Sequence, residues 1–221
     1  MEYLQLKIEL SLGTAFHTTG NRHHWGADKA LAMSADELFI IPATTVKGFI
    51  RRQAERLLRS WGKDVCTGPE PTKMCYGQNL CLICQLFGNP RYPSPLRFQD
   101  ATLQIPDQTA STIRSSVAIS RYRRATYPQR LFFTETTEAA STRWSLVVEG
   151  FFHDVVTAQA AASLVAMAIT WGPAIGGGHS RGLGWVEHSQ VQATLNGEII
   201  SQETLTRFWQ SWKGGESVAE D

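Results

Sequence analysis

The sequence predicts an α+β fold, because stretches with strand periodicity and stretches with helix periodicity follow one another in the order β–α–β–β–α–β. The strand stretches alternate apolar and polar residues, which is the pattern of a half-buried sheet. The two helical stretches instead repeat apolar residues every three or four positions. Since 43% of the 221 residues are hydrophobic, the chain can also bury a substantial core.

The first strand is predicted over residues 3–10, where apolar and polar side chains alternate. A loop with scattered glycines follows over residues 12–38 and leads into a short apolar run. The first helix is then predicted to begin at Thr44 or Thr45, either of which can cap it, and to end near Trp61. Its predicted buried face consists of Val46, Ile50, Ala54, Leu57 and Trp61.

The middle of the chain combines weakly periodic segments with clear elements. Residues 63–95 show little periodicity, and a strand is predicted over residues 96–103. Residues 105–140 are polar and basic, and we interpret them as a long excursion that contains a protruding hairpin. A strand over residues 144–152 and a mostly apolar helix over residues 154–171 follow.

The last strand is predicted to start within residues 183–188, and a short helix from about Leu205 to Trp212 precedes a polar tail. The order of the elements is that of a ferredoxin-like fold, which RNA-recognition domains share. We therefore predict one domain over residues 1–195 and a C-terminal segment over residues 196–221. The long insertions of this domain are residues 12–38, 63–95 and 105–140.

The charge of the chain is close to balanced, with a formal net value of +1. A free-standing nucleic-acid binder is usually more basic. The arginines are nevertheless unevenly distributed, and two clusters comprise Arg51, Arg52, Arg56 and Arg59, and Arg114, Arg121, Arg123, Arg124 and Arg130. This distribution fits a subunit whose nucleic acid is also held by neighbouring subunits, and ordinary solvated arginine is the alternative.

No membrane partner is expected, because the chain has no run of about eighteen apolar residues. The residues after Met1 also lack the charged-then-apolar pattern of a secretory signal. We therefore expect a cytoplasmic protein.

A glycine-rich loop lies between the second helix and the last strand and consists of Gly176, Gly177, Gly178, His179, Ser180, Arg181 and Gly182. Glycines let a backbone approach a ligand closely, and exposed amides in such a turn can bind an anion. Arg181 can add a bidentate phosphate contact, and His179 can stack or donate. The helix precedes the glycines, which disfavours a dinucleotide site, and no Walker lysine follows. A plain flexible turn is the alternative.

All four cysteines of the chain lie in one short stretch with the spacing C-x8-C-x5-C-x2-C. They are Cys66, Cys75, Cys81 and Cys84. The C-x2-C pair is a standard half-site for structural Zn²⁺, and the surrounding segment has too few apolar residues to fold alone. Four reduced thiols in a loop, or a redox-active C-x2-C pair, are the alternatives.

Asp28 lies in the first loop, close to His23, His24 and Trp25. A carboxylate here could hold Mg²⁺ or Mn²⁺, or help to activate a 2′-hydroxyl for phosphodiester cleavage. A solvated loop charge is the commoner role of such a residue. His23 and His24 could alternatively act as general acid and base.

Three segments together resemble the RAMP superfamily of CRISPR systems. The glycine loop resembles the family's signature before its last strand, and residues 41–51 resemble its "IP…KG" helix opening. Residues 86–89 resemble its "LFG" element, and all three segments occur in the family's order. The helix opening departs from the commoner Gly-Ser-Ser by reading Ala43-Thr44-Thr45, and the hairpin region matches only loosely.

Within that superfamily the chain is most similar to the backbone subunits of type III effector complexes. The resemblance implies a guide-RNA-binding subunit that assembles with other subunits and cleaves target RNA through Asp28. It also implies that the four cysteines bind zinc and that part of residues 112–140 forms the family's thumb. The expected RNA-binding residues are Lys47, Arg51, Arg52, Arg121, Arg123, Arg124, Gly176, Gly177, Gly178, His179, Ser180 and Arg181. A purely structural RNA-binding subunit and a repeat-processing endoribonuclease are the alternatives.

Overall fold

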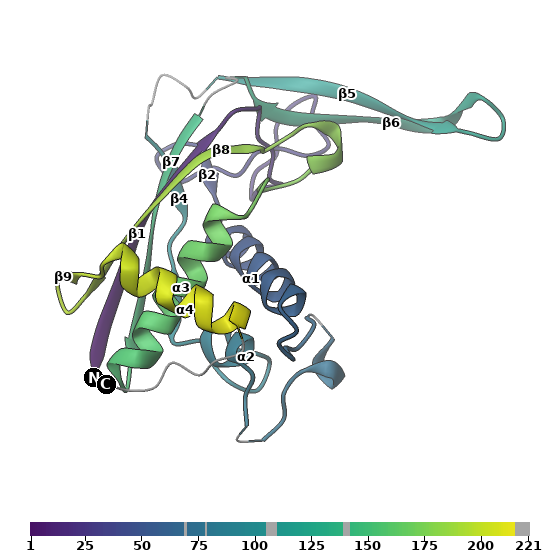
Figure 1. Cartoon of the computed structure of the whole chain (residues 1–221). Coiled ribbons are helices and arrows are strands. Elements are labelled where there is room, and N and C mark those ends of the chain that lie inside the picture. The colour runs from purple at the N-terminus through teal and green to yellow at the C-terminus, as the bar shows by residue number, and fades with distance from the viewer. Residues whose placement is uncertain (69, 78, 105–109, 139–141, 215–221) are drawn as a thin grey trace.

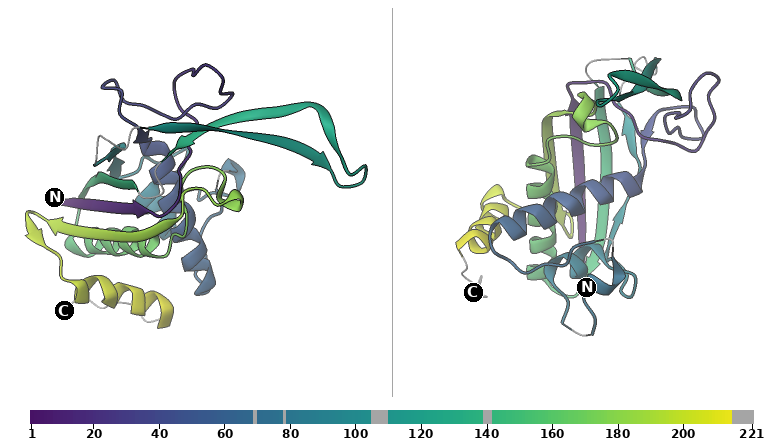
Figure 2. Two further views of the ribbon diagram at one scale, coloured as in Figure 1. Left: turned by 90° about the horizontal axis from the view of Figure 1, so that it is seen from above. Right: turned by 90° about the vertical axis from the view of Figure 1, so that its right-hand side faces the viewer.

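The computed structural model describes residues 1–68, 70–77, 79–104, 110–138 and 142–214. A seven-stranded sheet carries helices on one face, and a separate two-stranded hairpin projects away from it (Figures 1 and 2). The sheet consists of β1 (Glu2–Leu12), β2 (Ile40–Ile41), β3 (Leu96–Phe98), β4 (Ala101–Leu103), β7 (Thr142–Phe152), β8 (Val186–Leu195) and β9 (Glu198–Ile199). The hairpin consists of β5 (Ser111–Ser120) and β6 (Ala125–Thr137). The helices are α1 (Ala43–Ser60), α2 (Leu82–Phe87), α3 (Val155–Thr170) and α4 (Gln202–Gly214), with 3-10 turns at η1 (Pro71–Lys73) and η3 (His179–Arg181).

The strand order of the sheet is β2-β4-β7-β1-β8-β9, and β3 also pairs with β7. All of these pairings are antiparallel. The helix α1 connects the first part of the sheet to β3 and β4, and α3 connects β7 to β8. This mixed α+β arrangement is consistent with the predicted ferredoxin-like core. No helix in the described part of the chain is both long and apolar enough to cross a membrane.

The alternation along β1 determines which face of the sheet meets the helices. Its inward side chains are all buried and are Leu4, Leu6, Ile8, Leu10 and Leu12. They pack with the small residues of α3, which let that helix approach the sheet closely. Trp144 on β7 is fully buried and lies 5.4 Å from Phe16, measured between ring centroids. The core therefore lies between the sheet and α1 and α3.

The predicted capping of α1 by Thr44 or Thr45 is wrong. The helix begins one residue earlier, after Pro42, which makes no side-chain capping bond. Instead Asp100 supplies the cap from a distant part of the chain, since its Oδ1 accepts from the Ala43 amide at 2.7 Å. Asp100 lies where the strand predicted over residues 96–103 is interrupted and splits into β3 and β4. The interruption thus places a carboxylate at the start of α1.

The predicted hairpin is confirmed, and one buried carboxylate ties its base to the first long loop. Glu135 on β6 is fully buried and accepts from the Leu31 amide at 2.9 Å and from Ser111 Oγ at 2.7 Å. Arg22 Nη2 lies 2.6 Å from Glu135 Oε1. Burial raises the pKa of Glu135, but these hydrogen bonds and the Arg22 charge outweigh it and lower the pKa overall.

Replacing Glu135 by Ala should lower the free energy of unfolding by about 3 kcal/mol, because Arg22 and the Leu31 amide lose a buried partner. A lowered folded-state pKa also means that the stabilisation by Glu135 is complete above its ordinary value of 4.5 and is lost as the pH falls further. Urea unfolding at several pH values measures both effects. Glu138→Ala is the control, because Glu138 is exposed. Equal stability of the two variants at neutral pH would contradict the role of Glu135.

Candidate functional site

The glycine-rich loop is held in place by the chain that follows β1. Gly176 has a φ of +90°, and a Cβ at this position would lie 2.5 Å from the His17 carbonyl oxygen, so only glycine fits. The Gly177 amide donates to the same carbonyl at 2.7 Å, and the Gly184 amide donates to Ala15 at 2.9 Å. The loop is therefore a fixed wall and not a flexible turn.

This geometry refines the prediction of an anion-binding turn. The amide of Gly177 is already used by His17 and is not available to a ligand. The amides of Gly178, His179 and Ser180 donate no hydrogen bond within the described part of the chain. Gly178 has a φ of +77°, which directs the chain into the short turn that follows. These three consecutive amides are the part of the loop that suits an anion.

A cavity of about 510 Å³ opens beside the glycine loop. It lies between that loop, the base of the β5–β6 hairpin, residues 17–19 and the start of α1. Three cationic side chains line it, Lys29, Arg114 and Arg181, and no acidic residue does. None of the three forms an ion pair within the described residues. Seven residues with hydroxyl groups also line it, beside the apolar Phe132 and Leu183, and they are Thr18, Thr19, Thr45, Ser115, Ser116, Thr134 and Thr136.

Two polar groups in this cavity bear on its ligand. Thr136 Oγ1 is buried and has no hydrogen-bond partner among the described residues. His17 is buried, and its Nδ1 donates to the Glu135 carbonyl at 2.6 Å. Burial lowers the pKa of His17, and the charges of Lys29 and Arg181 lower it further. His17 is therefore neutral at pH 7, and the positive field of the cavity comes from the lysine and the two arginines.

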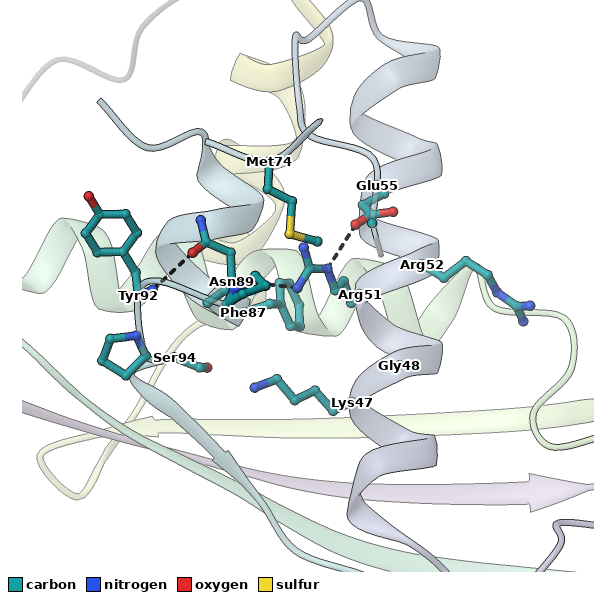
Figure 3. Close-up of a pocket in the computed structure, with 14 residues that line it drawn as sticks. Lys47, Gly48, Arg51, Arg52, Glu55, Met74, Phe87, Asn89, Tyr92 and Ser94 are labelled. Atoms are coloured by element: carbon teal, nitrogen blue, oxygen red, sulfur yellow. Dashed lines mark hydrogen bonds and ion pairs between the residues drawn. The ribbon is translucent and has the colours of Figure 1, made fainter. Parts of the chain in front are cut away.

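The structure does not bring Lys47, Arg51 and Arg52 to the glycine loop. They line a second cavity of about 690 Å³ between α1 and the "LFG" element (Figure 3). Arg51 connects these elements, since Nη1 donates to the Gly88 carbonyl and Nε to Glu55, each at 2.9 Å. Arg51 is thus largely committed to structural contacts, and only its Nη2 is buried without a partner.

The remaining predicted cations lie at the far end of the hairpin. Arg121, Arg123 and Arg124 are exposed in the turn between β5 and β6, away from the sheet (Figure 1). Conversely, the prediction missed His17 and Lys29 as lining residues and did not single out Arg114. Sequence proximity could not reveal them, because six separate stretches of the chain line the cavity. The hydroxyl-rich alternation of β6 was the one available signal.

The four cysteines form one cluster, as predicted from their spacing. Their sulfur atoms all lie within 4.8 Å of one another. A tetrahedral Zn²⁺ with bonds of about 2.3 Å separates its thiolates by about 3.8 Å, so the cluster could hold such an ion. The Cys75 amide donates to Cys66 Sγ at 3.1 Å, and the Cys81 amide to Cys75 Sγ at 3.2 Å. Such amide contacts stabilise thiolates, so the donor set fits a structural metal.

The cluster is anchored to the rest of the fold on two sides. Arg59 on α1 donates to the Cys66 carbonyl at 3.3 Å, and Asn89 donates to the Cys75 carbonyl at 3.2 Å. Burial raises the pKa of the Cys66 and Cys81 thiols, whereas the Cys81 amide lowers that of Cys75. A bound metal would compensate the cost of ionising the buried thiols.

Asp28 is exposed and lies along the edge of β6, next to Lys29, which lines the cavity. Its Oδ2 accepts from the Phe133 amide at 2.8 Å, and its own amide donates to the Phe133 carbonyl at 2.9 Å. The carboxylate is therefore fixed to the base of the hairpin, with one oxygen free. Among the described residues, the cysteine cluster is the only group of three or more potential metal ligands. A cation at Asp28 would consequently need ligands from elsewhere.

A family model of the RAMP superfamily matches residues 10–187. The chain belongs to the RAMP superfamily. Members of this superfamily are CRISPR-associated RNA-binding proteins, and they usually bind CRISPR RNA within complexes. The matched residues include the cysteine cluster, the glycine loop and the hairpin. A comparison with curated proteins found no match.

For the metal centre we expect one zinc ion per chain in elemental analysis of the reduced protein. Cys84→Ser should lose this ion and melt about 10 °C lower, because metal binding contributes to folding. Thr72→Ala is the control, since Thr72 is exposed in the same segment and is not a ligand. A wild-type protein that contains no metal and melts like Cys84→Ser would contradict the assignment.

Proposed function

We propose that this RAMP protein is a guide-RNA-binding backbone subunit of a type III CRISPR effector complex, and that it also cleaves target RNA through Asp28. The observation that carries the RNA-binding role is the cavity beside the glycine loop. Lys29, Arg114 and Arg181 line it without any acidic residue. A pocket with this lining attracts a polyanion, and the hydroxyls and free amides can hydrogen-bond its phosphates.

The binding contacts proposed here recognise the backbone of an RNA strand and not its bases. Every polar group that lines the cavity is a cation, a hydroxyl, a backbone amide or the neutral His17. Sequence specificity would then come from base pairing between guide and target, as in other RNA-guided systems. The arginines at the hairpin turn can extend the same electrostatic attraction along a duplex.

Cleavage requires a group beside the target phosphodiester, and Asp28 suits this role by position and anchoring. Asp28 is exposed and does not line the cavity, although the next residue, Lys29, does. A guide strand in the cavity would thus leave Asp28 for the strand paired with it. Mg²⁺ or Mn²⁺ held by Asp28 and RNA oxygens would supply Lewis-acid chemistry there.

A purely structural subunit is the second candidate. Among the described residues, Asp28 belongs to no group of three or more potential metal ligands, which favours this candidate because catalytic metal sites commonly have several protein ligands. The two candidates share the same RNA-binding cavity and differ only in the role of Asp28.

The RNA-binding role predicts that replacing both Arg114 and Arg181 by Ala weakens guide-RNA binding by at least about tenfold. The dependence of log affinity on log salt concentration should become shallower by about one unit per arginine. Filter binding at several salt concentrations measures both quantities. Arg207→Ala, on the exposed side of α4, is the matched control. An unchanged salt dependence in the double variant would place the RNA elsewhere.

The catalytic role predicts that Asp28→Asn and Asp28→Ala both reduce target cleavage at this subunit's position by about 10³-fold. Asp28→Asn can still accept a hydrogen bond from the Phe133 amide, so it separates loss of charge from loss of the anchor. Guide RNA content and subunit composition of the purified complex should stay the same. Full cleavage by Asp28→Asn would favour the purely structural subunit.

A further inference from the structure

The loop that carries Asp28 also contains a tryptophan, Trp25, whose side chain does not pack into the core. Trp25 is 98% exposed, although a buried indole normally contributes more to stability than any other side chain. It occupies the second position of a tight turn, in which the Ala27 amide donates to the His24 carbonyl at 3.1 Å. Gly26 has a φ of +83°, as the third position of a type II turn requires. A turn of defined geometry therefore holds the indole at the protein surface.

This turn rests on the hairpin, so its position relative to Asp28 is fixed. A Cβ on Gly26 would lie 3.6 Å from Ile113 Cδ1 of β5. Two residues later, Asp28 exchanges backbone and side-chain hydrogen bonds with Phe133 of β6. Both ends of the segment are thus attached to neighbouring strands, and the tryptophan lies three residues from the carboxylate.

The surface around the turn indicates the kind of partner. On the same face of the hairpin the paired residues Val117 and Leu131 are 43% and 58% exposed. Lys29, which forms no ion pair within the described residues, lies four residues further along the same loop. An exposed aromatic ring close to an unpaired cation is a combination that holds single-stranded nucleic acid, since bases stack on the ring and cations attract the phosphates.

We infer that Trp25 stacks on an unpaired base of the target RNA, next to the phosphodiester bond whose cleavage is proposed for Asp28. The inference rests on the proposed cleavage function and adds a positioning residue to it. Stacking would remove the base from the duplex and hold the adjacent phosphate at the carboxylate. Trp25 would affect the rate of cleavage far more than the affinity for target, because base pairing with the guide supplies most of that affinity.

The test uses the assembled guide-RNA complex under single-turnover conditions. Trp25→Ala and Trp25→Leu should slow cleavage at this subunit's site by about tenfold or more, whereas Trp25→Phe should retain most of the rate. Trp171→Ala is the matched control, because Trp171 is also exposed, at 62%, but follows α3. Full activity of Trp25→Leu would overturn stacking, since leucine keeps the apolar surface and loses only the aromatic ring.

A target with an abasic nucleotide on either side of the cleaved bond gives the decisive second measurement. In the wild-type complex one of these substitutions should slow cleavage as much as Trp25→Ala does, and in the Trp25→Ala complex it should cause no further loss. If the abasic nucleotide and Trp25→Ala instead lower the cleavage rate by separate factors that multiply, the inference is overturned. Loss of the subunit from Trp25→Ala complexes would also overturn it, because Trp25 would then be a protein-docking residue. Asp28→Asn in the same series shows separately whether the proposed cleavage function fails.

Discussion

The buried carboxylate of Glu135 is the contact on which the candidate site depends. Its side chain accepts from Leu31 and Ser111 and pairs with Arg22, while its backbone carbonyl accepts from His17. Its amide donates to the Lys29 carbonyl at 2.9 Å. One residue thus connects several points of the first loop to the base of the hairpin, beside the contacts that Phe133 makes with Asp28. A buried charge is costly unless all of its hydrogen bonds are made, so the arrangement is all-or-none.

The glycine loop forms the opposite wall of the cavity. Its backbone packs so closely against His17 that only glycine fits at position 176. Gly176 approaches the His17 carbonyl more closely than any side chain allows, and Gly177 donates to the same carbonyl. His17 therefore lies between two fixed elements, the hairpin through its ring and the glycine loop through its backbone. Because both walls are attached to one residue, the cations of the cavity are arranged before any ligand arrives. Such preorganisation reduces the entropy that binding costs.

Local patterns predicted the elements well, because periodicity follows from which face is buried. The alternation of β1 and the small apolar residues of α3 led to correct positions for both. Contacts between distant segments could not be predicted in this way. Asp100, which directly precedes the strand paired with β2, caps α1 from a distant part of the sequence, and Lys29 lines the cavity from a loop whose backbone bonds to Phe133 and Glu135. The sequence led to the prediction that Arg51 binds RNA. The structure shows that Arg51 instead hydrogen-bonds to Glu55 and to the Gly88 carbonyl.

The alternation of β6 explains how the base of one strand can hold two neighbouring parts of the site. Thr134 and Thr136 face the cavity beside the glycine loop, whereas the Glu135 carboxylate between them and the backbone of Phe133 hold the loop with Asp28. Successive side chains of a strand point to opposite faces, so the threonines line the cavity while the Glu135 carboxylate reaches the first loop from the other face. A slip of one residue would bury the hydroxyls under the loop and expose the carboxylate. Under the proposed function, this register gives the guide strand the cavity hydroxyls and leaves the Glu135 carboxylate to hold the loop that carries Asp28.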